Sequence, residues 1–257
     1  MMEPFERIDI QELPLSVPHF RRQVEAFLGN NGLRLEEVDL YLAVLDDTGS
    51  ILAGGGLHRD VLKGIAVSEA ARSAGLSVPL ISRLVTVAAE RGHTNLKVFT
   101  KPENRSVFES LGFRMLAEAP KAVLLENGRG LEAYCSYLRS LRREGRNGVV
   151  VMNANPFTLG HQYLVSKALE HVDTLYVIPV REDCTRFSYE ERLAMIRAGV
   201  ASWGDRVTVV EGSAYCISAA TFPTYFLKDL SDASETQICL DLDLFARHLA
   251  PALGAAI

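Results

Sequence analysis

The sequence contains few cysteines and no excess of positive charge. Among 257 residues there are four cysteines, and no two of them stand at metal-ligand or redox spacing: Cys135, Cys184, Cys216 and Cys239. This excludes a zinc knuckle and a CxxC redox centre, predicts no metal site, and indicates free thiols in a reducing cytoplasm. Lys and Arg number 27 against 32 Asp and Glu, a net charge of −5. That balance excludes a general nucleic-acid binder, so any phosphate site has to be local.

Long apolar runs are also missing. No stretch approaches the ~18 uninterrupted apolar residues that a membrane span requires, so no membrane association is expected. Residues 1–6 lack a charged segment followed by an apolar core, and a signal peptide is therefore not expected. Hydrophobic residues make up 48% and charged residues 23%, which is typical of globular proteins. Because domains usually span ~100–200 residues, the length predicts one large or two modest domains.

The first half has the pattern of a mixed sheet with helices. Pro79 lies near the start of a helix expected over 78–91, and Gly92 is its stop signal. A glycine-rich break at 126–130 and a charged helix at 131–144 end this half. We therefore predict a first domain at 1–128, a connecting helix at 129–147 and a second domain at 148–257. Further strands are expected at 39–45, 51–57, 62–67, 96–100 and 113–125, and a short helix at 104–111.

The second half alternates strands with helices. Its first strand, 148–152, is a continuous apolar run, as in a strand buried on both faces. Ser188 and Glu191 form a capping box that starts one of the helices. Such alternation predicts parallel pairing and a doubly wound, Rossmann-like α/β sheet. The remaining strands are expected at 174–180, 207–211 and 237–242, and the remaining helices at 160–170 and from Pro223.

The most informative segment joins the first strand of the second half to the helix that follows. Residues 153–161 form a polar turn, and the helix begins at Gly160. Ligands of open parallel sheets bind beyond the carboxyl ends of the strands, and a helix start offers N–H groups to a phosphate. Thr158 and His161 are three residues apart, so both can face one phosphate. A plain turn with His161 as an ordinary cap or surface histidine is the alternative.

Two motifs in this half resemble the nucleotidylyltransferase superfamily. The first is TLGH at 158–161, a threonine variant of the His-x-Gly-His signature, and the second is FSYEERL at 187–193. The strings NANPFTLGH at 153–161 and ISAATFPTYFLK at 217–228 are similar to those of one family in it, the citrate lyase ligases. This resemblance covers nearly all of 148–254.

The resemblance implies roles for particular residues. Thr158 and His161 become the expected catalytic pair, stabilising the α-phosphate of ATP in the transition state. The family pattern continues past Gly254 with a further strand and a nucleotide-contacting segment, so 148–257 is expected to be incomplete at its C-terminus. The residues expected to bind nucleotide are Asn153, Asn155, Phe157, Gly160, Arg192, Ser218 and Thr221.

The first half resembles GNAT acetyltransferases. Arg72 and Gly75 lie in a loop between strand and helix, where backbone N–H groups can cradle a pyrophosphate. Asn104 precedes the string VFESLGF at 107–113, and together these resemble the GNAT pattern that binds the pantetheine of CoA. Ser77 and Phe108 depart from that pattern, and Phe108 has no proton to give. The resemblance therefore implies binding of a pantetheine thiol rather than independent acetyl transfer, with a folded domain that holds no ligand as the alternative.

The two resemblances imply one reaction. ATP, acetate and the CoA-like thiol of the citrate lyase acyl-carrier subunit would give AMP, diphosphate and an acetyl thioester through acetyl-adenylate, with Mg²⁺ accompanying ATP. Two other functions stay open. One is a pantetheine-phosphate-type adenylyltransferase, which would need a phosphorylated acceptor and no acetate. The other is a carrier-binding module without activity, which would bind the carrier but no nucleotide.

Overall fold

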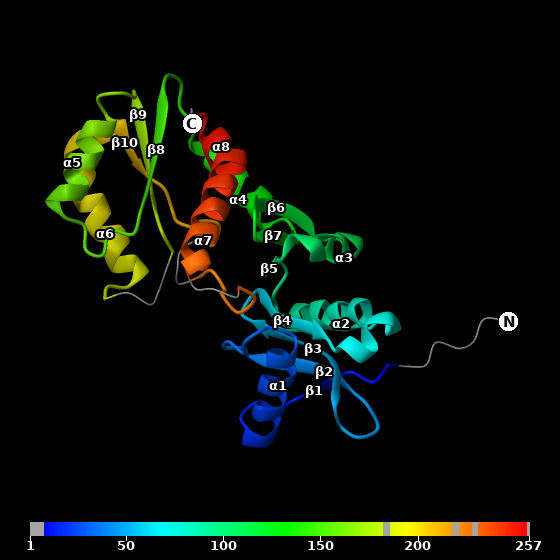
Figure 1. Ribbon diagram of the computed structural model, residues 1–257. Coiled ribbons are helices and arrows are strands. Elements are labelled where there is room, and N and C mark those ends of the chain that lie inside the picture. Colours follow the sequence, from blue (N-terminus) through cyan, green and yellow to red (C-terminus); the bar gives the residue numbers. More distant parts are fainter. Residues whose placement is uncertain (1–7, 182–185, 218–220, 228–230, 256–257) are drawn as a thin grey trace. The chain divides into compact units, whose positions relative to one another are not determined.

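The chain forms two units in a computed structural model, which describes residues 8–181, 186–217, 221–227 and 231–255 (Figure 1). The first unit comprises Met1–Gly128 together with Pro223–Ala233. The second comprises Arg129–Phe222 and Ser234–Ile257. A segment from the later half of the sequence thus folds with the first unit, whereas the sequence analysis included it in 148–257.

The first unit is built on a seven-stranded sheet with the order β1-β2-β3-β4-β5-β7-β6. Only β4 and β5 pair in parallel and the other neighbours are antiparallel, so the predicted mixed sheet is confirmed. The strands are β1 Gln11–Glu12, β2 Leu40–Leu45, β3 Ile51–His58, β4 Val61–Val67, β5 Leu96–Thr100, β6 Arg114–Ala119 and β7 Ala122–Asn127. The helices are α1 Pro18–Asn30, η1 Glu69–Ala74, α2 Ser77–Glu90, η2 Pro102–Asn104 and α3 Arg105–Ser110.

Helices cover both faces of this sheet. Leu40, Leu42 and Val44 of β2 belong to the core under α2 and α3. Tyr41 and Ala43, which alternate with them, belong to the core under α1. The helix α1 was not predicted from the sequence. One strand was expected over 113–125, but β6 and β7 form a hairpin there, because the chain reverses between Ala119 and Ala122.

The strands β4 and β5 separate partway along their length. They pair only at Val61 with Lys97 and at Leu62 with Val98, although β4 continues to Val67 and β5 to Thr100. The later residues of both strands therefore do not pair with each other. Residues on both sides of this gap line a cavity of the first unit, which is described below.

The second unit contains a three-stranded parallel sheet with the order β10-β9-β8. Its elements are α4 Gly130–Leu141, β8 Asn147–Met152, α5 Leu159–Ala168, β9 Thr174–Pro179, α6 Tyr189–Val200, η3 Ala201–Arg206, β10 Val207–Val209, α7 Ser231–Leu244, the π-helical turn η4 Phe245–Leu249 and α8 Ala250–Leu253. The central strand β9 is fully buried, as is usual inside a parallel sheet. The prediction that the strand at 148–152 is buried on both faces is wrong, because β8 lies at the edge of the sheet and is only half-buried over residues 148–151.

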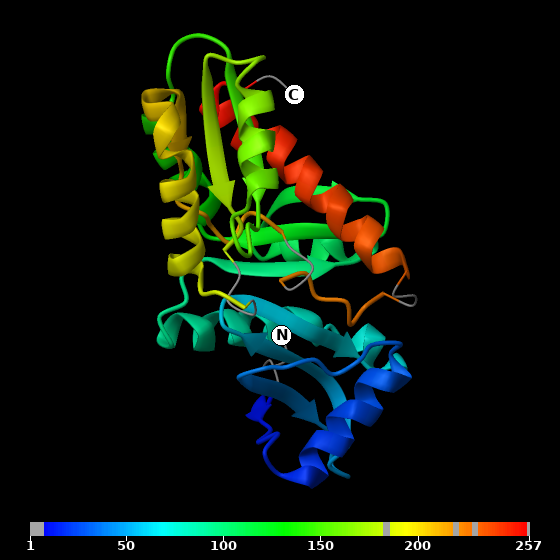
Figure 2. The same cartoon turned by 90° about the vertical axis from the view of Figure 1, so that its left-hand side faces the viewer.

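The helices of the second unit lie on both faces of its sheet. Leu175 and Val177 of β9 pack with α5 and α6, which run side by side (Figures 1 and 2). The hydroxyl of Tyr176, on the other face, donates to the carbonyl of Leu141 at the end of α4 at 2.9 Å. This arrangement confirms the predicted doubly wound α/β class. Within the described ranges, no helix has both the length and the apolar content to cross a bilayer.

Two predicted elements in the later part of the chain are wrong. Residues 221–227 form turns rather than a helix starting at Pro223. The apolar segment 237–242 is not a strand but part of α7. The burial pattern gives the reason, because Thr236, Leu240 and Leu244 are buried at a spacing of four residues, which is the repeat of a helix face.

The capping box of α6 is confirmed and supports a stability prediction. Ser188 Oγ accepts from the N–H of Glu191 at 3.2 Å, and Glu191 Oε2 accepts from the N–H of Ser188 at 2.8 Å. Ser188→Ala is expected to lower the free energy of unfolding of the second unit by ~1 kcal/mol. Trp203, the only tryptophan, lies in this unit, so its fluorescence in urea can report the change. Ser188→Asp keeps the acceptor; an equal loss in both variants would contradict the capping explanation.

Candidate functional site

A tight turn follows β8 in the second unit. Ala154 has a φ of 48°, a conformation that non-glycine residues rarely adopt, and the Asn155–Pro156 peptide is cis. Asn153 and Asn155 are both exposed. The side-chain oxygen of Asn155 accepts from the N–H of Phe187 at 3.3 Å. The turn therefore presents two amide side chains to solvent beyond the carboxyl end of a parallel strand.

The helix α5 starts with a reciprocal contact between Thr158 and His161. His161 Nδ1 accepts from the N–H of Thr158 at 3.0 Å and lies 2.8 Å from Thr158 Oγ1. Because Nδ1 is an acceptor here, a neutral imidazole carries its proton on Nε2. In the described part of the chain, no residue hydrogen-bonds to Nε2. This nitrogen is thus left as an available N–H donor at the helix start.

The ring of His161 is also held by packing. Phe157 stacks on it with 5.3 Å between ring centroids and an angle of 25°. A Cβ on Gly199 of α6 would overlap the Phe157 ring, so a glycine is required where α6 passes under this pair. At Gly160 a Cβ would meet nothing closer than Thr158 Oγ1 at 3.6 Å. The missing side chain of Gly160 therefore leaves the helix start open to a ligand rather than serving packing.

Arg192 supports the turn from beneath. Its side chain is completely buried, and Nη1 donates to the carbonyl of Asn153 at 2.9 Å, to Asn153 Oδ1 at 3.0 Å and to the carbonyl of Val180 at 2.9 Å. The sequence analysis assigned Arg192 a direct contact with nucleotide. With the side chain buried beneath the turn, a role in positioning Asn153 fits the structure better.

The other predicted nucleotide-binding residues lie in a separate segment. Thr221 is exposed in a turn, and Ser218 lies outside the described residues. Just before it, the N–H of Ile217 donates to Asp241 Oδ1 at 2.7 Å, and its carbonyl accepts from Gln237 at 2.5 Å. Burial raises the pKa of Asp241. Two side chains of α7 thus fix the main chain at Ile217.

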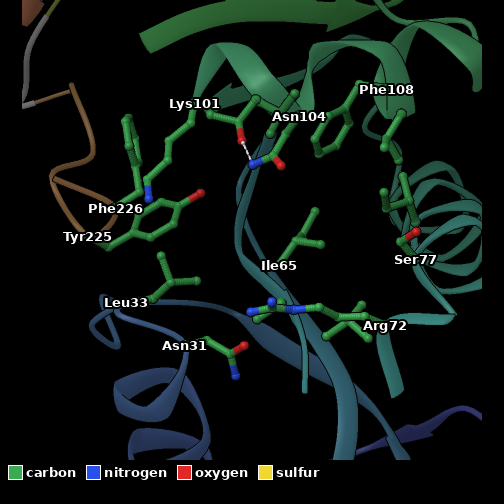
Figure 3. A pocket seen from close by; sticks show the side chains of 16 residues that line it. Asn31, Leu33, Ile65, Arg72, Ser77, Lys101, Asn104, Phe108, Tyr225 and Phe226 are labelled. Atoms are coloured by element: carbon green, nitrogen blue, oxygen red, sulfur yellow. Dashed lines mark hydrogen bonds between the residues drawn. The ribbon is translucent and has the colours of Figure 1, made fainter. Parts of the chain in front are cut away.

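The first unit holds a cavity of about 300 Å³ where β4 and β5 separate (Figure 3). Arg72 and Asn104, both predicted from sequence, line it, and Asn104 donates to Thr100 Oγ1 at 3.0 Å. Gly75 does not line it; with a φ of 65° it ends η1 instead. The volume is at the lower end of the range for ligand sites. The apolar part of the wall includes Ile65, Val67, Ile81, Val98, Val107 and Phe108.

Lys101 and Tyr225 are among the residues of this cavity that the sequence did not predict. Lys101 directly follows β5 and Arg72 lies in η1. Within the ranges that the structure describes, neither Arg72 nor Lys101 forms an ion pair. Two cations beside an apolar wall suit an anionic ligand with an apolar part. Lys101 could have been found from the sequence, because it directly follows the predicted strand at 96–100. Nothing in the sequence around Tyr225 indicates that it lies at this cavity.

Comparison with known proteins identifies relatives of this chain. A family model described as the citrate lyase ligase C-terminal domain matches residues 147–256. The chain is 41% identical over 254 residues to the citrate (pro-3S)-lyase ligase of Haemophilus influenzae, covering 97% of this chain and 74% of that protein. It is 43% identical to the protein of the same name from Klebsiella pneumoniae, covering 91% of this chain and 69% of that protein. It is 39% identical to the protein of the same name from Escherichia coli K12, covering 90% of this chain and 66% of that protein.

Solved structures match about half of the chain. An acyl-CoA N-acyltransferase from Pseudomonas aeruginosa has a TM-score of 0.41 at 16% identity, covering 47% of this chain and 99% of that chain. A GNAT-family acetyltransferase from Staphylococcus aureus has a TM-score of 0.38 at 13% identity, covering 46% and 97%.

Proposed function

The chain belongs to the citrate lyase ligase family, and from this we propose that it uses ATP to acylate the thiol prosthetic group of the citrate lyase acyl-carrier subunit with acetate. The observation that carries the proposal is the fixed imidazole at the start of α5, with Nδ1 engaged by Thr158 and Nε2 available as a donor. Family membership supports a ligase reaction on citrate lyase, and this geometry supports a phosphate-activating step in the second unit.

The first step is activation of acetate. A carboxylate oxygen of acetate attacks the α-phosphorus of ATP, the bond from that phosphorus to the bridging oxygen breaks, and diphosphate leaves, giving acetyl-adenylate. Negative charge grows on the α-phosphate oxygens in the transition state. The Nε2–H of His161 and the N–H groups of Leu159 and Gly160 at the start of α5 are donors suited to this charge. Thr158 orients the imidazole for that task.

The second step is transfer to the thiol. The sulfur of the carrier's CoA-like group attacks the carbonyl carbon of the mixed anhydride, the bond to the phosphate oxygen breaks, and AMP leaves while the thiol proton passes to solvent. We propose that the cavity of the first unit holds the arm that bears this thiol. Its apolar wall suits the alkyl parts of pantetheine, and Arg72 and Lys101 suit a phosphate.

Magnesium was expected to accompany ATP. Among the described residues, no three His, Cys, Asp or Glu side chains gather where they could hold a metal ion. Because Mg²⁺ is commonly held by substrate phosphates with few carboxylates, we assign it no protein ligand and no step.

The decisive experiment measures exchange of labelled pyrophosphate into ATP. Acetate is expected to be required for exchange, and addition of the carrier with its thiol group should consume acetyl-adenylate and release AMP. Exchange that needs 4′-phosphopantetheine instead of acetate would support the adenylyltransferase alternative. Carrier binding by calorimetry, without exchange and without ATP binding, would contradict the enzymatic proposal and favour the binding module.

A further inference from the structure

A segment from the later half of the sequence forms part of the wall of the first unit's cavity. We call residues 224–227 the aromatic segment; Tyr225 and Phe226 line the cavity (Figure 3). Arg34 donates from its main chain to the carbonyl of Tyr225 at 3.1 Å and from Nη2 to the carbonyl of Thr224 at 2.9 Å. Glu36 Oε1 accepts from the N–H of Thr224 at 2.9 Å. The aromatic segment is therefore fixed by directed hydrogen bonds and does not rest there by apolar contact alone.

The hydroxyl of Tyr225 lies in the gap between β4 and β5. It donates to the carbonyl of Phe99 on β5 at 3.2 Å, and the residue is 6% exposed. Burial raises the pKa of Tyr225, so the phenol keeps its proton over the physiological range. With that proton directed to Phe99, the hydroxyl oxygen can only accept hydrogen bonds, one of them from the backbone N–H of Gly64, and its remaining lone pair can accept another.

Two other polar residues of the cavity have the opposite character. Arg72 and Lys101 are donors only, whereas the amide and hydroxyl side chains of the wall can both donate and accept. In Figure 3 the Tyr225 hydroxyl points toward the middle of the cavity, between Lys101 and Ile65. A ligand that pairs with Arg72, Lys101 and Tyr225 and also covers the apolar wall needs an anionic group, an apolar stretch and an N–H or S–H donor.

We infer that the Tyr225 hydroxyl is a positioning group that accepts a hydrogen bond from the amide N–H of a pantetheine-type arm, so that the aromatic segment helps to determine which thiol the first unit binds. This inference rests on the proposed function, because it takes the thiol arm as the ligand of the cavity. It adds a residue from the later half of the sequence to a site that the sequence analysis built from Arg72, Gly75 and Asn104 alone.

The test compares Tyr225→Phe with a matched control, Tyr176→Phe. The Tyr176 hydroxyl is also buried and donates to a main-chain carbonyl, that of Leu141 at 2.9 Å, but Tyr176 belongs to the second unit and does not line the cavity. With dephospho-CoA as the calorimetric probe, Tyr225→Phe is expected to raise Kd by about 3–10-fold, the range for one net hydrogen bond. Tyr176→Phe should leave Kd unchanged.

A kinetic readout and a second ligand separate positioning from general damage. Tyr225→Phe should raise KM for the thiol substrate and leave acetate-dependent pyrophosphate exchange unchanged. An analogue whose amide nearest the thiol is an ester should bind the unaltered protein about 3–10-fold more weakly than dephospho-CoA. This comparison needs no variant and still applies if Tyr225→Phe fails to fold.

The possible failures are distinguishable. If the unaltered protein does not bind dephospho-CoA, the thiol cavity of the proposed function falls together with this inference. If it binds dephospho-CoA and the ester analogue equally, or if Tyr225→Phe binds as tightly as the unaltered protein, the role of Tyr225 alone is refuted.

Discussion

Replacement of His161 by alanine is expected to lower acetate-dependent pyrophosphate exchange by about 10²–10³-fold, the usual cost of removing one donor to a developing oxyanion. The imidazole is aimed by Thr158 through Nδ1 and stacked on Phe157, so its Nε2–H is fixed before substrate arrives. A donor that acts mainly in the transition state affects turnover more than binding. The exchange rate should therefore fall while the dissociation constant of ATP changes little.

His171→Ala is the matched control for this variant. His171 is an exposed histidine that follows the other end of α5, away from the turn. Its removal should leave exchange unchanged. Thermal unfolding of both variants identifies any loss of folded protein, because His161 also caps α5. Unchanged exchange in a folded His161→Ala protein would refute the proposed role of the imidazole.

The second large effect is a loss of stability when Arg192 is replaced. Arg192→Met keeps much of the side-chain volume but removes the guanidinium that donates to Asn153 and Val180. Hydrogen bonds to charged groups contribute ~1.5–3 kcal/mol, and acceptors left without a donor in the interior add to the loss. We expect the free energy of unfolding of the second unit to fall by about 3 kcal/mol. Urea denaturation followed by Trp203 fluorescence measures it.

Arg197→Met provides the comparison for Arg192. Both arginines lie on α6, but Arg197 is exposed, so its replacement should change stability by no more than about 0.5 kcal/mol. The positioning role also predicts that Arg192→Met weakens ATP binding, since the turn at Asn153 loses its support. Similar losses of stability in the two variants would show that the buried hydrogen bonds contribute little.

The features that were predicted correctly depend on residues that are close together in the sequence. Ser188 and Glu191 are three residues apart, and a capping box needs no other part of the chain. The turn before α5 was likewise predictable, because an apolar strand, a polar turn and a glycine stand in one continuous stretch. For the same reason Thr158, His161 and Phe157 are found together in the structure.

The wrong predictions concern segments whose structure depends on residues far away in the sequence. Ile238, Leu240 and Leu242 alternate as in a strand, yet Ile238 and Leu242 are exposed and only Leu240 is buried. Local alternation cannot reveal that an apolar residue points to solvent. Nor can it show that Tyr225 meets Phe99, more than a hundred positions earlier in the chain. The buried position of Arg192 depends in the same way on two loops that it joins.

The first unit is formed by two separate stretches of the sequence, and this limits where the chain can be cut without disrupting it. A gene cut after Gly128 would separate Arg34 and Glu36 from Thr224, their hydrogen-bonding partner. The carbonyl of Phe99 would lose the phenol that covers it. Exchange of halves between related genes therefore preserves the first unit only when a short internal stretch travels with it. Recombination at a single crossover would combine the amino-terminal half of one protein with the aromatic segment of a relative. The hydrogen bonds between these two parts would then join residues from different proteins.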